Sequence, residues 1–153
     1  MLNFLRPFRT MLVASAALTL HAHAAADKLW MTDYDKALEQ AKAENKPVLI
    51  NFTGSDWCGW CIRLRNEVFS QQQFKSYAKK NLVLLEVDFP RKKELPEEQQ
   101  TANRKLAREY GIRGYPTIVV LNPDGSEAGQ LGYMEGGPTP FISKLKKLVK
   151  PKA

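Results

Sequence analysis

The chain has 153 residues, of which 44% are hydrophobic and 25% charged, enough for one globular core and too little for two domains. Its formal net charge is +7 at pH 7, but the lysines and arginines are spread over several segments and no nucleic-acid-binding motif accompanies them. We therefore interpret the charge as a solvated basic surface, and we expect no nucleic-acid partner.

The first segment differs in composition from the rest of the chain. Basic residues at 6 and 9 precede an apolar run over 11–20, and small residues follow over 22–26. This order is typical of a secretory signal. We predict cleavage after Ala24, which gives a signal peptide over 1–24 and a mature domain over 25–153.

A permanent membrane anchor is the alternative interpretation of this segment. Only 17 residues separate Arg9 from Asp27, and two of them are histidines, whereas a spanning helix needs about 20 apolar residues. We therefore expect a periplasmic or secreted protein without a permanent anchor. Cleavage would remove both histidines, His21 and His23, and leave a mature charge of 21 − 16 = +5.

The mature chain opens with a predicted helix and a buried strand. Thr32 followed by Asp35 resembles a capping box, and apolar residues at helical spacing then predict a helix over 33–45. The short apolar run over 48–52 has the length of a buried strand.

A second helix and strand are predicted next. The helix runs over 57–70 and begins with the two cysteines, and Ser70 is expected to cap its continuation to Lys79. The almost wholly apolar segment 82–88 is the next strand. A helix that connects two buried strands indicates a parallel pair.

The last third of the chain follows a charged, proline-bearing connection over 89–97. A helix is predicted over 98–110, and strands over 117–121 and 127–133 are separated by turn residues that indicate a hairpin. Apolar residues from Phe141 to Val149 predict one face of a final helix. The order of elements predicts an α/β fold with a central mixed β-sheet and helices on both faces.

The mature chain contains two cysteines, Cys58 and Cys61, separated by Gly59 and Trp60 at a predicted strand-to-helix junction. A c-type haem site needs histidine directly after the second cysteine, where Ile62 stands. A structural zinc needs four ligands, of which the mature chain offers two unless a second molecule contributes. A purely structural disulfide would close a very short loop, worth about 2 kcal/mol in the chain-entropy model. We therefore favour a redox-active pair, and we expect no metal and no cofactor.

The place of the pair indicates which sulfur reacts. Disulfide exchange is carried out by a thiolate, and the unpaired N–H groups at a helix start favour an anion. Cys58 is therefore predicted to be the nucleophile. Cys61 lies one turn further on, within reach of a mixed disulfide at Cys58, so we predict a resolving thiol that is less exposed and less acidic.

The run from Trp57 to Cys61, preceded by the strand over 48–52 and followed at a distance by Gly114-Tyr115-Pro116-Thr117, resembles the thioredoxin superfamily over about residues 28–150. Among its members the chain looks most like bacterial secreted thioredoxin-like proteins. The resemblance implies a thioredoxin-like fold and a thiol–disulfide oxidoreductase that acts on disulfides of exported proteins. A membrane-borne electron donor is then expected, because no cofactor motif occurs in the chain.

The resemblance also assigns roles to single residues. It implies catalytic Cys58 and Cys61, and a cis peptide bond before Pro116 that lies against the cysteine pair. The backbone of Tyr115 is implied to pair with an extended substrate peptide. The implied substrate contacts are Trp57, Gly59, Trp60, Tyr115 and Pro116.

The sequence departs from the family pattern in three places. Gly59-Trp60 replaces Gly-Pro between the cysteines, so the redox potential cannot be carried over, and Trp60 is a candidate apolar contact surface. Asn51 stands nearest to the buried aspartate of thioredoxins and cannot accept a proton; Asp56 is a candidate substitute, although we favour an exposed loop carboxylate. No histidine lies between the cysteines, where a cation would stabilise the thiolate of a strong oxidant.

These departures favour a reductant or isomerase. Two alternatives stay open from the sequence: an oxidant of the same fold, and a non-catalytic module that binds a partner through Trp57, Trp60 and Tyr115. The sequence does not explain the 89–97 connection.

Overall fold

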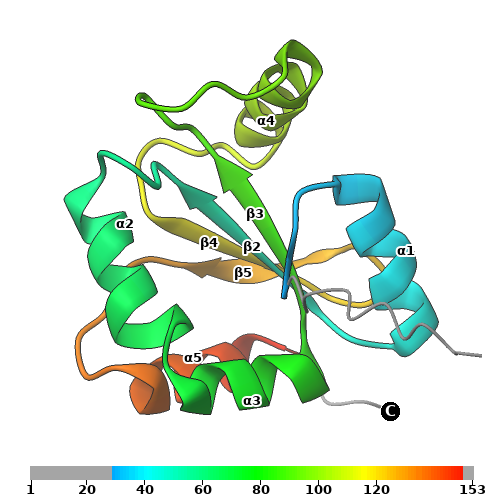
Figure 1. The fold of residues 1–153 in the computed structure, drawn as a ribbon. Coiled ribbons are helices and arrows are strands. Elements are labelled where there is room, and N and C mark those ends of the chain that lie inside the picture. The colour runs from blue at the N-terminus through cyan, green and yellow to red at the C-terminus, as the bar shows by residue number, and fades with distance from the viewer. Residues whose placement is uncertain (1–28, 150–153) are drawn as a thin grey trace, which may run out of the picture.

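A central mixed sheet organises the protein, for which the computed structural model describes residues 29–149 (Figure 1). The predicted signal peptide over 1–24 lies outside the described residues. The strand order is β1-β3-β2-β4-β5, with β1 and β2 parallel to β3, and β4 antiparallel to both β2 and β5. The strands are β1 (Trp30–Met31), β2 (Val48–Thr53), β3 (Val83–Asp88), β4 (Thr117–Leu121) and β5 (Glu127–Leu131).

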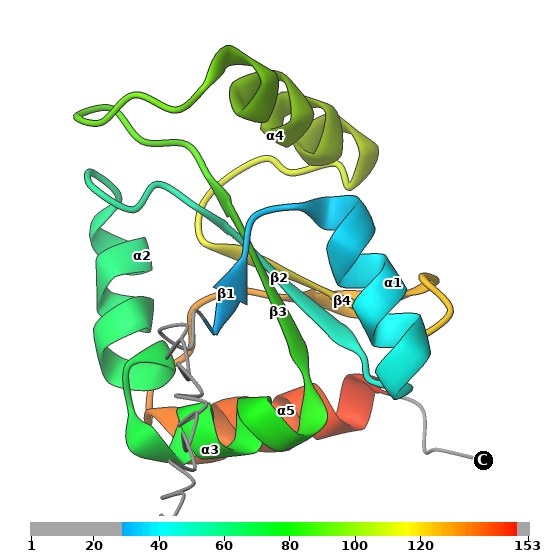
Figure 2. The ribbon, with the colours of Figure 1, turned by 45° about the vertical axis from the view of Figure 1, so that its right-hand side comes forward.

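Helices cover both faces of this sheet, as predicted (Figure 2). The helices α1 (Tyr34–Glu44) and α4 (Glu97–Glu109) lie on one face, and α2 (Gly59–Leu64), α3 (Gln72–Asn81) and α5 (Pro138–Leu148) lie on the other. A π-helical turn, η1 (Arg65–Phe69), continues α2 toward α3. The sequence predicted the mixed character of the sheet, its parallel β2–β3 unit and the β4–β5 hairpin correctly, but not its edge strand β1.

The core is divided into two layers by the alternating side chains of the strands. Leu49 of β2 and Leu84 of β3 point to the face that Phe74 and Phe141 cover, while Ile50 and Leu85 point to the face of α1 and α4. All six residues of β2 are buried. This double burial explains why the central strands read as continuous apolar runs rather than alternating ones.

Several predicted boundaries were wrong by a few residues. The cap of α1 is Asp33, not Thr32, because the Asp33 carboxylate accepts the Lys36 N–H at 3.1 Å. Ser70 does not cap α3. Its N–H bonds to the Arg65 carbonyl at 2.7 Å and closes η1, and Gln71 precedes α3 instead.

Strand β1 and the π-helical turn were missed by the sequence analysis. Two residues are too few to show a period, and only pairing of Trp30 with Leu84 and of Met31 with Leu85 makes β1 a strand. Between residues 29 and 149, no helix has the length and apolar character needed to cross a membrane.

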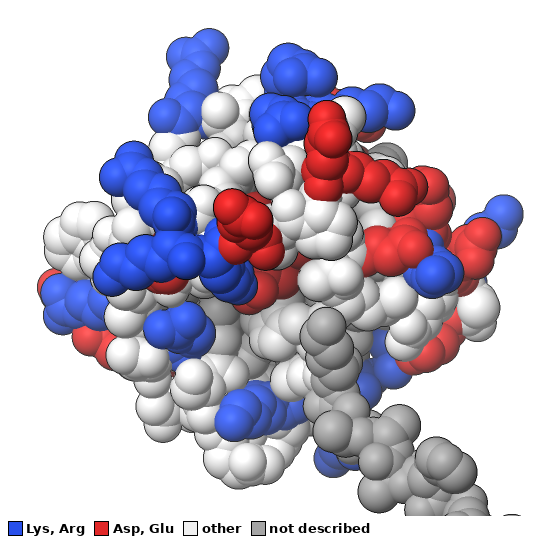
Figure 3. Space-filling view, turned by 45° about the horizontal axis from the view of Figure 1, so that its top comes forward, with Lys and Arg blue, Asp and Glu red and all other residues white. Residues whose placement is uncertain are grey.

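Charge is unevenly distributed over the face that the β3–α4 connection and α4 help to form. Figure 3 shows Lys and Arg side chains over its left-hand part, where Figure 1 places α2 and the tip of the connection, and also along its upper edge. Asp and Glu side chains gather mostly in the centre and on the right.

Candidate active site

Cys58 and Cys61 are joined by a disulfide at the start of α2, with their Cα atoms 5.2 Å apart. Cys58 is the N-cap residue, and its Sγ accepts the Cys61 N–H at 3.2 Å. A turn that precedes the helix sets this position, since the Cys58 N–H donates to the Gly54 carbonyl at 2.9 Å. This turn is also why α2 begins at Gly59 rather than at Trp57.

Both cysteines are buried, with exposed fractions of 7% for Cys58 and 4% for Cys61. Cys61 is the less exposed of the two, as predicted, but the difference in exposed fraction is small. A partner that exchanges with Cys58 therefore has to bring its own sulfur into close contact with the protein. The side chains that surround the disulfide decide which partners can do so.

Trp57 lies directly before the disulfide and is held firmly in place. Its indole N–H donates to the Phe89 carbonyl at 2.7 Å, and its ring meets the Tyr115 ring edge-on, with centroids 6.0 Å apart. A Cβ at Gly54 would approach the indole to 2.5 Å. Glycine at this position lets the indole lie against the backbone.

The peptide bond between Tyr115 and Pro116 is cis, as the family resemblance implied. Tyr115 lies just outside the β2–β4 ladder, which ends at the pair Phe52 and Thr117. Its ring packs on Phe89, with centroids 5.2 Å apart, as well as on Trp57. The aromatic contacts thus join the cis-proline segment to the residue next to Cys58.

Gly59 and Trp60, between the cysteines, are exposed, and 55% of Trp60 is accessible. The indole is nevertheless held by neighbours: its ring lies 5.1 Å from that of Tyr133, and the Arg63 guanidinium lies 5.5 Å from its centroid. Glu67 ties these groups together, because it accepts from Arg63 at 2.6 Å and from the Tyr133 hydroxyl at 2.7 Å. The ordered indole offers an apolar surface beside the disulfide.

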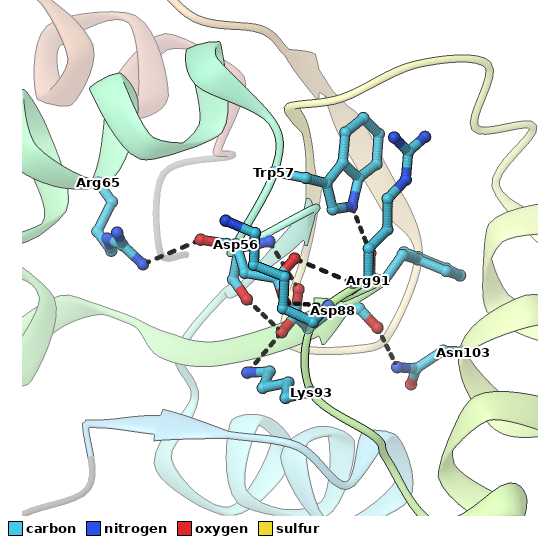
Figure 4. A network of polar contacts seen from close by, with 10 residues as sticks. Asp56, Trp57, Arg65, Asp88, Arg91, Lys93 and Asn103 are labelled. Carbon is cyan, nitrogen blue, oxygen red and sulfur yellow. Dashed lines mark hydrogen bonds and ion pairs between the residues drawn. The ribbon is translucent and has the colours of Figure 1, made fainter.

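A buried carboxylate anchors the loop that carries the cysteines (Figure 4). Asp88, at the end of β3, is only 6% exposed. It accepts from the Ser55 N–H at 2.9 Å and from the Ser55 hydroxyl at 2.6 Å, and Lys93 pairs with it at 2.8 Å. Asn103 of α4 donates to the Asp88 carbonyl at 2.8 Å. One residue thus links β3, the cysteine loop and α4.

Asp56 forms a second clamp, from the cysteine loop to the β3–α4 connection (Figure 4). Its two carboxylate oxygens accept the backbone N–H groups of Arg91, at 2.9 Å, and Lys92, at 2.8 Å. The hydrogen bond from Arg91 is the largest cause that lowers the pKa of Asp56. The sequence predicted an exposed loop carboxylate at this position. In the structure, the Asp56 carboxylate holds the β3–α4 connection through its backbone.

Asn51 lies in β2, opposite Glu86 of β3. It is buried, and within residues 29–149 its side-chain oxygen has no hydrogen-bond partner. Asn51, Glu86 and Cys61 line a common cavity of about 350 Å³. The carboxylate that shares a cavity with the inner sulfur thus comes from the neighbouring strand, which the sequence analysis did not single out.

The described residues hold no group of three or more His, Cys, Asp or Glu side chains arranged to bind a metal ion. The site therefore consists of one disulfide, an aromatic border made of Trp57, Trp60 and Tyr115, and two carboxylate clamps behind it. This arrangement can carry out exchange between its own sulfurs and those of a partner.

Comparison with known proteins gives consistent results. The thioredoxin-like domain family matches residues 34–148. Disulfide bond reductase DsbH of Chlamydia pneumoniae is 39% identical over 127 residues, which are 83% of this chain and 76% of that protein. Thioredoxin-related protein DsbJ of the same organism is 28% identical over 134 residues, which are 86% of this chain and 38% of that protein. A solved structure of a DsbH oxidoreductase has a TM-score of 0.74 at 38% identity and covers 78% of this chain and 82% of that one.

Proposed function

Because the chain belongs to the thioredoxin-like family and is a thiol–disulfide oxidoreductase, we propose that it reduces disulfide bonds of exported proteins. The observation that carries the proposal is the Cys58–Cys61 pair at the start of α2, in a chain 39% identical to a disulfide bond reductase. That relative's name states reduction rather than oxidation.

The reaction takes place in two exchanges. The Cys58 thiolate attacks one sulfur of the substrate disulfide, forms a mixed disulfide and releases the other substrate sulfur as a thiolate. Cys61 then loses its proton and attacks Sγ of Cys58, which releases the second substrate sulfur and leaves the Cys58–Cys61 disulfide. Two electrons pass to the substrate, and two have to be resupplied by a membrane-borne donor before the next cycle.

The helix start supports Cys58 as the attacking sulfur. Its Sγ already accepts the Cys61 N–H at 3.2 Å, and the same amide can stabilise a thiolate there. Cys61 is the more buried of the two and faces the cavity with Asn51 and Glu86, which suits a resolving thiol. Substrate contacts are proposed for the residues that border the pair, namely Trp57, Gly59, Trp60, Tyr115 and Pro116.

The redox equilibrium with glutathione tests the direction of electron flow. No histidine occurs in residues 25–153 to stabilise the thiolate as a cation, so we expect a low potential, closer to the about −270 mV of thioredoxin than to the about −120 mV of a strong oxidant. The measurement is the fraction of reduced protein, by thiol labelling, over a series of glutathione buffers. A disulfide that is already reduced in mildly reducing buffers would indicate an oxidant instead.

We further propose that the protein is exported and loses residues 1–24. The basic, apolar and small-residue order of this segment supports export. Sequencing the N-terminus of the protein isolated from the producing cell is expected to give Ala25 as the first residue. A first residue at Met1 would argue against cleavage.

A further inference from the structure

We propose that Arg91 and Lys92 form a cationic rim, which docks acidic polypeptide segments beside the disulfide. This inference rests on the proposed function, since it names the kind of substrate that the redox site prefers. It also assigns a role to the 89–97 connection, which the sequence left without one.

The rim lies next to Trp57, the residue that precedes Cys58. The Arg91 guanidinium stacks on the Trp57 ring, 3.8 Å from its centroid, and Trp57 directly precedes Cys58 (Figure 4). Arg91 and Lys92 are both exposed. The hydrogen bonds that their backbone N–H groups donate to Asp56 fix their position relative to the cysteine loop. The two cations are therefore held at the border of the redox site.

The cations near the disulfide differ in whether an acidic side chain neutralises them. Lys93 is paired with Asp88, and Arg63, which lies beside Trp60, is paired with Glu67. Within the described part of the chain, neither the Arg91 guanidinium nor the Lys92 ammonium forms an ion pair. Asp56, the acidic residue nearest to Cys58 in sequence, accepts the backbone N–H groups of Arg91 and Lys92 with its two carboxylate oxygens. The border of the site thus presents positive charge, in agreement with the basic left-hand part of Figure 3.

The burial of Cys58 indicates the kind of partner that the rim can bind. Cys58 is 7% exposed, so a substrate has to bring a sulfur close to it, and residues beside that sulfur then lie near the rim. A polypeptide loop can do this, whereas a flat anionic membrane could touch the cations without reaching the sulfur. Complementary charge at a border speeds encounter and favours one class of partner over another. Asp or Glu next to the substrate cysteine fits this rim.

The test uses two disulfide peptides of equal length, one with Asp and Glu beside its cysteines and one with Asn and Gln. Reduced protein is mixed with each peptide, and the second-order rate constant is followed by Trp fluorescence. We expect the acidic peptide to react about tenfold faster at low ionic strength, with the ratio falling as salt is added. In Arg91→Gln/Lys92→Gln the ratio is expected to fall to about one.

The controls separate charge from structure. Lys144→Gln/Lys147→Gln removes the same charge from α5, at the opposite end of the molecule in Figure 1, and is expected to keep the ratio. Arg91→Lys keeps the positive charge but weakens stacking on Trp57. We expect this variant to keep most of the rate ratio between the acidic and the neutral peptide. Equal rates with both peptides, or a ratio unchanged in the rim variant, would overturn the inference.

A failure of the proposed function looks different. If the protein reduces neither peptide, the proposed reductase function is wrong. Binding of the same peptides to the oxidised protein, measured by calorimetry, then tests whether the rim docks acidic segments. Tighter binding of the acidic peptide, lost in the rim variant, would support it. A rim variant that loses binding to phosphatidylglycerol vesicles while its peptide preference is unchanged would instead assign these cations to a membrane surface.

Discussion

Replacing Cys58 by serine is expected to reduce the rate of protein disulfide reduction to that of the buffer alone. Serine has nearly the same shape, but its hydroxyl is not ionised near neutral pH and does not attack a disulfide. The measurement is reduction of insulin or another model protein disulfide, with dithiothreitol as the electron source. Full activity in Cys58→Ser would refute the assignment of this sulfur as the nucleophile.

Cys61→Ser is the matched control, because it also removes the internal disulfide and one thiol. It leaves the attacking sulfur in place but removes the sulfur that resolves the adduct. We therefore expect substrate to accumulate as a mixed disulfide with Cys58, visible as a higher-mass band on a non-reducing gel that disappears with reductant. If the Cys58→Ser variant accumulated the mixed disulfide instead, Cys61 would be the attacking sulfur and Cys58 the resolving one.

The parts of the fold that the sequence predicted are those fixed by local patterns. The apolar runs of β2 and β3 are buried on both faces, so no other element of their length fits them. The Trp57–Cys61 motif and Tyr115-Pro116 identified the redox site and its cis peptide bond, because each needs only neighbouring residues to be recognised.

The contacts that the sequence did not predict join segments that are far apart along the chain. Asp56 and Asp88 look like ordinary loop and strand-end acids, and nothing near them indicates that one binds the amides at 91 and 92 and the other binds Ser55. The Asn51–Glu86 pair likewise depends on the register between β2 and β3, which an apolar run does not specify. The environment of the disulfide was therefore only partly predictable.

The Asp88 clamp can be tested by its effect on stability. Asp88→Ala is expected to lower the free energy of unfolding by about 2–4 kcal/mol, because it removes charge-assisted hydrogen bonds and leaves the Ser55 amide without its partner. The measurement is urea unfolding of the oxidised protein, followed by Trp fluorescence. Because Ser55 lies three residues before Cys58, we also expect slower exchange with a substrate disulfide.

Two further variants separate the hydrogen bonds from the ion pair. Lys93→Ala removes only the ammonium, whose side chain is 53% exposed, and is expected to cost at most about 1 kcal/mol. Asp88→Asn keeps the shape of the side chain and one hydrogen-bond acceptor. Its loss in the free energy of unfolding is therefore expected to lie between those of Asp88→Ala and Lys93→Ala. If Asp88→Ala and Lys93→Ala lower the free energy of unfolding by the same amount, the Asp88 carboxylate contributes only through its ion pair with Lys93. The cysteine loop must then be held by Asp56 and the Trp57 contacts alone.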